Sequence, residues 1–143
     1  MITERKIIKL IDLARKCNLC AMSHFKNLDR TQVDYKEDLS PLTKADIEVN
    51  IIAVEGLKKL FPDIEIVSEE SKNSHNSLKN NKVFWLVDPI DGTKEFISKS
   101  PNFTVNFALI KNNFPVFGLI AQLYTDTVWY NYSDKAWKLE KNY

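Results

Sequence analysis

One short stretch, an apolar run that ends in acid, constrains this chain more than any other feature. Residues 83–87, VFWLV, are typical of a buried strand without alternation, and DPIDGT follows directly. Because Pro89 cannot continue a ladder of backbone hydrogen bonds, we expect the strand to stop abruptly at Asp88. Asp88 and Asp91 are then held close together on a rigid support.

Two carboxylates held close together repel each other unless a cation lies between them. Mg²⁺ prefers oxygen ligands, and the backbone carbonyl of Ile90 is well placed to add a third oxygen to those of Asp88 and Asp91. Gly92 and Thr93 then offer backbone N–H groups to a phosphate oxygen. A DPxDG sequence is also typical of a plain turn, so this motif alone leaves both interpretations open.

Two upstream motifs place further acids beside predicted elements. Glu69 and Glu70 follow a short predicted strand at 64–67, although paired glutamates are usually part of a solvated loop. Thr43 and Asp46 have the spacing of a capping box at the start of a helix. The ionised form of a carboxylate is favoured in a first helical turn, which suits Asp46 to act as base partner for a hydroxyl group.

The apolar periodicity predicts two amphipathic helices before the strands. Apolar residues recur every three or four positions over residues 3–27, and again over residues 47–61. Thr43 offers an N-cap to the second helix, and Pro62 closes it. The segment between the helices, residues 28–42, lacks this period, and we interpret it as a connection.

Beyond the second helix the pattern is typical of strands. A polar loop at 68–82 separates the strands predicted at 64–67 and 83–87. Apolar residues alternate over 103–109, and hairpin spacing continues through PVFGLIAQLY, DTVWYNY and KAWKL. Two N-terminal helices packed on a largely antiparallel sheet make the predicted fold class α+β.

Composition excludes several classes of protein. The 143 residues suffice for one domain, and 20 Lys and Arg against 19 Asp and Glu leave a net charge of +1. This charge provides no bulk field to attract nucleic acid or an anionic membrane. The N-terminus is too charged for a secretory signal, and no apolar run reaches the length of a transmembrane span. We therefore expect a cytoplasmic protein without a nucleic-acid partner, with peripheral attachment to the inner membrane left open.

The two cysteines exclude a disulfide-rich secreted scaffold. Cys17, Cys20 and His24 fall on one face of the first predicted helix and could imitate part of a zinc site. A structural zinc ion normally needs four ligands, and the only other histidine, His75, falls in a distant polar loop. We interpret both cysteines as small hydrophobic residues of the core.

Three motifs together carry a resemblance to a known family. The motifs DLSPLTKAD at 38–46, VSEES at 67–71 and WLVDPIDGTKEFI at 85–97 resemble the inositol monophosphatase superfamily of Mg²⁺-dependent, lithium-sensitive phosphatases. The longer form DPIDGTKEFI most resembles its 3'(2'),5'-bisphosphate nucleotidase branch, the CysQ type. NFTVNFALI, PVFGLIAQ and KAWK also resemble that branch, so the likeness covers essentially the whole chain.

The resemblance implies a role for each residue of these motifs. The implied ligands of the family's two or three Mg²⁺ ions are Glu69, Asp88, the Ile90 carbonyl and Asp91. The implied substrate-binding residues are Glu69, Ile90, Asp91, Gly92 and Thr93. Asp46 matches an aspartate that hydrogen-bonds the threonine at Thr93, and with Glu69 this catalytic pair is expected to orient and deprotonate the attacking water. Lys36 matches a lysine near the site.

The implied reaction is the hydrolysis of a small phosphorylated substrate without a covalent enzyme intermediate. For the bisphosphate nucleotidase branch the substrate is 3'-phosphoadenosine 5'-phosphate, which yields AMP and phosphate in a disposal step of sulfate activation. Inositol monophosphate is the alternative substrate. A non-catalytic remnant or interaction module is the alternative function.

Family members resemble this chain over about their first half and continue into a second domain whose Trp-Asp motif completes a metal site. We therefore expect residues 1–143 to form the N-terminal metal-binding domain, the first half of an α-β-α-β-α sandwich, with weak or no activity alone. Asp126 and Asp134 lie in predicted turns and are not expected to replace the missing ligand. A sheet face left uncovered would favour self-association or binding of a complementary C-terminal fragment.

Overall fold

The computed structural model describes residues 2–28, 33–37, 41–71 and 82–140. The helices are α1 (Glu4–Asn27), α2 (Lys44–Leu60) and the short α3 (Thr93–Ile97). The strands are β1 (Asp34–Tyr35), β2 (Pro41–Leu42), β3 (Glu65–Ser68), β4 (Val83–Asp91), β5 (Thr104–Lys111), β6 (Phe114–Gln122), β7 (Thr127–Tyr132) and β8 (Lys135–Leu139). The predicted loop at 68–82 lies largely outside the described residues.

The main sheet is a meander with one parallel pair at its edge. Its six strands follow the chain in the order β3-β4-β5-β6-β7-β8, so every strand lies beside its neighbour in sequence. β3 and β4 are parallel, whereas each later pair is antiparallel. β4 connects to β5 through α3, and short turns join the strands from β5 to β8. The predicted α+β class and the largely antiparallel meander are confirmed.

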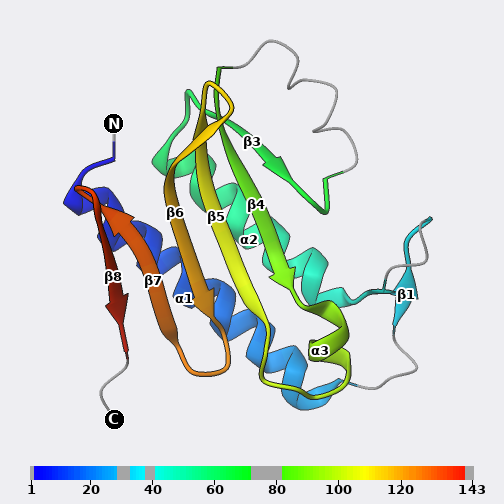
Figure 1. The fold of residues 1–143 in the computed structure, drawn as a ribbon. Helices are drawn as coiled ribbons and strands as arrows, with labels where there is room; N and C mark the ends of the chain where they lie inside the picture. The colour runs from blue at the N-terminus through cyan, green and yellow to red at the C-terminus, as the bar shows by residue number, and fades with distance from the viewer. Residues whose placement is uncertain (1, 29–32, 38–40, 72–81, 141–143) are drawn as a thin grey trace.

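Both long helices pack on the same face of the sheet (Figure 1). Alternate residues of β5, including Val105 and Phe107, are buried beneath them, and Trp85 of β4 is fully buried in the same core. The two helices also contact each other closely. A Cβ atom at Gly56 of α2 would lie 2.2 Å from Leu13 Cδ1 of α1, so a glycine permits this approach.

The ends of the long helices follow the predicted local chemistry. Thr3 caps α1 and accepts a hydrogen bond at 3.4 Å from the backbone N–H of Lys6. Thr43 is the N-cap of α2, and its backbone N–H donates to Asp46 Oδ2 at 2.8 Å. The capping box inferred from the spacing of Thr43 and Asp46 is therefore present, and it fixes the Asp46 carboxylate in the first turn of α2.

The end of β4 differs from the sequence expectation. The strand does not stop at Asp88 but continues to Asp91, with a register shift against β5 between these two residues. Pro89 lies within this irregular part of the ladder, where a missing N–H is tolerated. The strand is also not buried on both faces, because Leu86 is 45% exposed.

Three short elements were not expected from the sequence. β1 and β2 form a two-residue antiparallel ribbon in the segment that we interpreted as a connection. α3 follows β4 directly and spans only five residues, too few to show an apolar period. In Figure 1 this helix lies at the C-terminal end of β4, where the functional motif is found.

No described helix covers the second face of the main sheet (Figure 1). Leu86 of β4, Ile120 of β6 and Trp129 of β7 are all exposed on strands of this sheet. Tyr130 and Tyr132, also on β7, instead pack against the core. The aromatic side chains of β7 thus divide between the two faces. No helix of the described residues is both long and apolar enough to cross a membrane.

Buried and exposed positions of the sheet predict unequal effects of the same substitution. Phe107 of β5 is 1% exposed, whereas Phe114 of β6 is 72% exposed. We expect Phe107→Ala to lower the free energy of unfolding by about 3–5 kcal/mol, because it opens a cavity under the helices. Phe114→Ala, the matched control, should change it by about 0.5 kcal/mol or less. Urea unfolding of both variants measures the difference, and equal losses would contradict this core.

Candidate functional site

The site is built where the parallel pairing of β3 with β4 ends. Ser68 pairs with Val87, and the backbone N–H of Glu69 then donates to Val87 O at 3.0 Å. This bond extends the alignment by one residue and brings Glu69 beside Asp88. Because parallel strands deliver their C-terminal residues to the same edge of the sheet, the acids of VSEES and DPIDGT meet there.

Asp88 is the most strongly perturbed acid of this edge. Burial, followed by the negative charges of Glu69 and Asp91, raises the pKa of its carboxyl group to about 7. Its Oδ1 atom is buried and accepts no hydrogen bond from the described residues. A buried carboxylate oxygen without a donor is a position where a cation would be stabilised.

Lys36 lies against the two glutamates that follow β3. Its Nζ atom is 2.6 Å from Glu70 Oε1 and 3.2 Å from Glu69 Oε1. Partial burial would lower the pKa of the Lys36 ammonium, but the hydrogen bonds to Glu70 and Glu69 outweigh it and raise the pKa. Burial also raises the pKa of Glu70 in spite of the lysine. Glu69 and Glu70 therefore do not form the fully solvated loop that is usual for paired glutamates.

Asp46 connects the first turn of α2 to the start of α3. Its Oδ1 atom accepts a hydrogen bond at 3.0 Å from Thr93 Oγ1, and its Oδ2 atom accepts one at 2.5 Å from Thr43 Oγ1. The Thr93 hydroxyl also lies 3.2 Å from the carbonyl oxygen of Ile90. Asp46 is only 1% exposed, so its orientation is fixed by the surrounding structure. The expected contact between Asp46 and Thr93 is present.

The turn that carries Asp91 depends on a glycine. Gly92 has φ 93°, and a Cβ atom there would lie 2.8 Å from the backbone oxygen of Asn102. Only glycine fits this position without strain. The next residue, Thr93, begins α3. The glycine thus allows the chain to turn from the sheet into the helix and presents the Thr93 hydroxyl to Asp46.

The sequence did not indicate the role of Asn106. This residue lies opposite Asp88 on β5, and its Nδ2 atom donates to Asp91 Oδ2 at 3.1 Å. Its place at the site follows from the register of β4 and β5, which the alternation of β5 alone does not give. The structure also keeps Asp126 away from this site, since it accepts a hydrogen bond from Asn18 of α1.

The predicted residues gather at one edge, but they do not form a closed cage. Within the described residues, Glu69, Asp88 and Asp91 do not form a set whose ligand atoms all lie within 4.8 Å of one another. Asp91 points to Asn106, and Glu69 points to Lys36. A bound cation would have to draw these carboxylates together, and their role as metal ligands stays a prediction.

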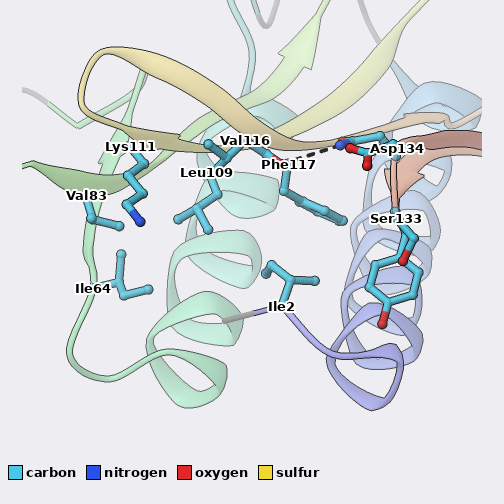
Figure 2. Close-up of a pocket in the computed structure, with 11 residues that line it drawn as sticks. Ile2, Ile64, Val83, Leu109, Lys111, Val116, Phe117, Ser133 and Asp134 are labelled. Carbon is cyan, nitrogen blue, oxygen red and sulfur yellow. Dashed lines mark hydrogen bonds between the residues drawn. The ribbon is translucent and has the colours of Figure 1, made fainter.

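A separate pocket of about 530 Å³ lies at the other end of the sheet (Figure 2). It is lined by Ile64, just before β3, by Val83 at the start of β4 and by Leu109 and Phe117. The Lys111 side chain lies at its edge in Figure 2. Val83 pairs with Lys111 at the end of the ladder remote from Asp91, so this largely apolar pocket is distinct from the acidic site.

The chain matches a family model and named relatives over nearly its whole length. The model of the inositol monophosphatase family matches residues 3–140. A 3'(2'),5'-bisphosphate nucleotidase CysQ of Buchnera aphidicola is 38% identical over 140 residues, which are 98% of this chain and 53% of the relative. The CysQ of Salmonella typhimurium is 38% identical over 132 residues, with 92% and 54% covered.

Solved structures have the same fold. An IMPase of Thermotoga maritima matches with a TM-score of 0.80 and 26% identity, covering 94% of this chain and 51% of that one. CysQ from Bacteroides thetaiotaomicron matches with a TM-score of 0.73 and 31% identity, covering 94% and 48%. This chain therefore spans about half the length of the relatives that it matches.

The raised pKa of Asp88 predicts how stability depends on pH in the presence of a chelator. Because the folded pKa of about 7 lies above the value of 3.8 expected without burial, the folded state binds the proton more tightly. Stability should therefore fall as pH rises from about 4 to about 7, and level off above that. Asp88→Asn should remove this part of the dependence, so that the variant gains stability relative to the parent protein as pH rises.

Thermal unfolding at several pH values measures this effect. Asp12→Asn, which changes an exposed aspartate of α1, is the matched control and should follow the parent protein. A parallel pH dependence in the parent protein and in Asp88→Asn would contradict the crowding of charge at Asp88.

Proposed function

The chain belongs to the inositol monophosphatase family, and on this premise we propose that it supplies the catalytic edge of a Mg²⁺-dependent phosphomonoesterase. The observation that carries the proposal is that two groups of side chains lie together at one edge of the sheet. Glu69 and Asp88 lie just past the last parallel pair of β3 and β4, and the Thr93 hydroxyl donates to the buried Asp46 at 3.0 Å. The carboxylates of Glu69 and Asp88 can hold cations, and the hydrogen-bonded pair of Thr93 and Asp46 can move a proton.

The relatives support a bisphosphate nucleotide as substrate. The proteins from Buchnera aphidicola and Salmonella typhimurium are named 3'(2'),5'-bisphosphate nucleotidases. We infer that the same activity is the function here, with 3'-phosphoadenosine 5'-phosphate cleaved to AMP and phosphate. Inositol monophosphate is the second candidate substrate. The inositol monophosphatase family model and the IMPase of Thermotoga maritima also match nearly the whole of this chain.

The acidic edge fits the metal that this family generally binds, Mg²⁺. The donors are carboxylates and a carbonyl, which are the hard oxygen ligands that Mg²⁺ prefers. The buried Asp88 Oδ1 atom has no hydrogen-bond donor among the described residues, and the crowded negative charge around it would be relieved by a cation. The residues that would hold the metal are Glu69, Asp88, the Ile90 carbonyl and Asp91. When bound, Mg²⁺ would act as a Lewis acid and neutralise charge on the phosphate and the leaving oxygen.

The chain's own groups can prepare the attacking water. Thr93 Oγ1 donates its proton toward Asp46 Oδ1, so its lone pairs are free to accept a hydrogen bond from a water molecule. As the water oxygen forms a bond to phosphorus, the water proton passes to Thr93 and the Thr93 proton to Asp46. The ester P–O bond breaks at the same time, and the leaving oxygen keeps the bonding electron pair and takes a proton from solvent to become the alcohol product. Glu69, on the neighbouring strand, would orient the same water. No covalent bond to the enzyme is required.

The turn after β4 would bind the phosphate. Gly92, with φ 93°, turns the chain from β4 into α3, and the backbone N–H groups of Gly92 and Thr93 are the proposed donors. Lys36 partly neutralises Glu69 and Glu70, which lowers the repulsion that an anionic substrate would meet at this edge.

We further propose that residues 1–143 act as the N-terminal metal-binding half of the site. They span about half of each matched relative, and the carboxylates do not form a closed cage. The remaining metal ligand and the nucleotide contacts would then come from a second domain or fragment. A non-catalytic interaction module is the alternative, and the exposed sheet face with Leu86, Ile120 and Trp129 favours it.

Binding of Mg²⁺ should be measurable as stabilisation of the folded chain. When free Mg²⁺ exceeds the dissociation constant about 100-fold, we expect the free energy of unfolding to rise by about 2.7 kcal/mol. Asp88→Asn and Asp91→Asn should abolish this rise, because each removes a carboxylate of the acidic edge. Asp12→Asn should keep it. An equal rise in all three variants would place the ion elsewhere.

Catalysis is tested by combining residues 1–143 with the C-terminal half of a CysQ relative and measuring phosphate release from 3'-phosphoadenosine 5'-phosphate. We expect little release from residues 1–143 alone and clear release from the mixture. Thr93→Ala should lower the rate about 10²–10⁴-fold, since it breaks the proton path to Asp46. Ser98→Ala, which removes a hydroxyl from the residue after α3, is the matched control.

Three outcomes of this assay would change the proposal. Ordinary turnover by residues 1–143 alone would contradict the half-site. Release from inositol monophosphate in preference to the nucleotide would replace the substrate. A mixture that binds Mg²⁺ through Asp88 and Asp91 but releases no phosphate would favour the non-catalytic alternative.

A further inference from the structure

A second group of ligand-type side chains lies between α1 and α2. The Nε2 atom of His24 on α1 is 2.8 Å from Glu48 Oε2 on α2, and Cys20 Sγ on α1 is 3.9 Å from the same oxygen. One ligand atom from each of these three residues lies within 4.8 Å of the other two. Among the described residues, this is the one group of three or more such side chains that is so closely spaced.

We propose that Cys20, His24 and Glu48 form a binding site for Zn²⁺ or a similar divalent transition metal, with a fourth position open to solvent. The donor set supports this class of metal, since sulfur, imidazole nitrogen and carboxylate oxygen are the ligands that Zn²⁺ takes in proteins. Mg²⁺, which prefers oxygen ligands alone, fits the acidic edge instead.

The scaffold around the three side chains is rigid. Cys20 and His24 are four residues apart on α1, so they lie one above the other on the same face of the helix. Buried neighbours hold both helices in place. Ala21 of α1 and Val49 of α2, each adjacent to a proposed ligand, are fully buried in the shared core. A site on two packed helices needs little rearrangement to bind an ion.

The charge arrangement leaves one oxygen of Glu48 for the metal. Lys44 Nζ lies 3.5 Å from Glu48 Oε1, whereas Oε2 is the atom near His24 and Cys20. A pocket of about 510 Å³, lined by His24, Asp34 and Lys44 among others, gives solvent a path to the imidazole ring. This opening provides an entry route and room for a water molecule as the fourth ligand.

The sequence interpretation of the cysteines as core residues holds fully for Cys17 and only in part for Cys20, which packs against the core without being fully buried. Cys17 is fully buried in the core, as expected, but Cys20 is only partly buried and faces Glu48. The sequence argument against a metal counted Cys17 as a ligand and required four protein donors. Glu48, which α2 brings to His24 across 24 positions of sequence, was absent from that count.

This site is separate from the acidic edge. Asp46 and Glu48 are two residues apart on α2, and residues at that spacing do not share a helix face. Asp46 is buried against Thr93, whereas Glu48 is turned toward α1. The inference therefore does not rest on the proposed phosphatase activity, and either can fail without the other.

The test is a titration of the protein with Co²⁺ as a spectroscopic substitute for Zn²⁺, in the presence of excess Mg²⁺ to occupy the acidic edge. We expect one bound Co²⁺ ion per chain with a thiolate-to-metal charge-transfer band in the near ultraviolet. The oxygen ligands of the acidic edge cannot produce this band. Competition with Zn²⁺ should remove it and give the Zn²⁺ affinity.

Matched variants assign the ligands. Cys20→Ser should abolish the thiolate band, whereas Cys17→Ala, at the other cysteine, should leave it unchanged. His24→Gln and Glu48→Gln should each weaken binding by more than about tenfold, because loss of a direct ligand should cost at least as much as loss of an outer-shell partner. Zn²⁺ should also raise the unfolding temperature of the parent protein more than that of these two variants.

Several results would overturn the site. These are the absence of a thiolate band, its loss in Cys17→Ala rather than Cys20→Ser, or unchanged affinity in both His24→Gln and Glu48→Gln. His24 and Glu48 are partly exposed, so their variants keep the test decisive even where Cys20→Ser fails to fold. Far-ultraviolet circular dichroism confirms that each variant is folded before titration.

Discussion

Repulsion between carboxylates at one edge of the sheet is the constraint on which the candidate site depends. Asp88 is partly buried beside Glu69 and Asp91, and the combined effect raises its pKa to about 7. A fold that only needed a turn here would gain by replacing these acids with neutral residues. The scaffold keeps them together through the β3–β4 pairing, and Lys36 and Asn106 balance only part of the charge. A bound cation would neutralise the remaining negative charge.

Local chemistry explains why much of this arrangement could be predicted from the sequence. The long helices have uninterrupted apolar periods, and Thr43 and Asp46 have the spacing of a capping box, so their positions follow from neighbouring residues alone. The meander was predictable because β5 alternates strictly and the turns from β5 to β8 are short. The joint placement of Glu69 and Asp88 needed one further step, namely that both residues directly follow a parallel pair of strand residues, Ser68 and Val87.

The features that could not be predicted from the sequence are set by contacts between distant segments. Asn106 joins the site through strand register, and Glu48 meets His24 only because α2 packs on α1. Leu86 was expected to be buried, but its face of β4 depends on which side the helices cover. Pro89 was expected to end the strand, whereas an irregular ladder accommodates it. In each case the missing information was the distant segment that packs or pairs with the residue.

The exposed sheet face and the acidic edge are physically continuous. Asp88 lies opposite Asn106, Asn106 opposite Ile120, and Ile120 opposite Trp129, so these four residues form one row across four strands on the same face. Any surface that covers Ile120 and Trp129 would therefore also reduce the access of water to Asp88. Reduced hydration strengthens the repulsion among the acids and the attraction of a cation to them. Docking on the apolar face and cation binding at the edge would consequently reinforce each other, even though no side chain serves both.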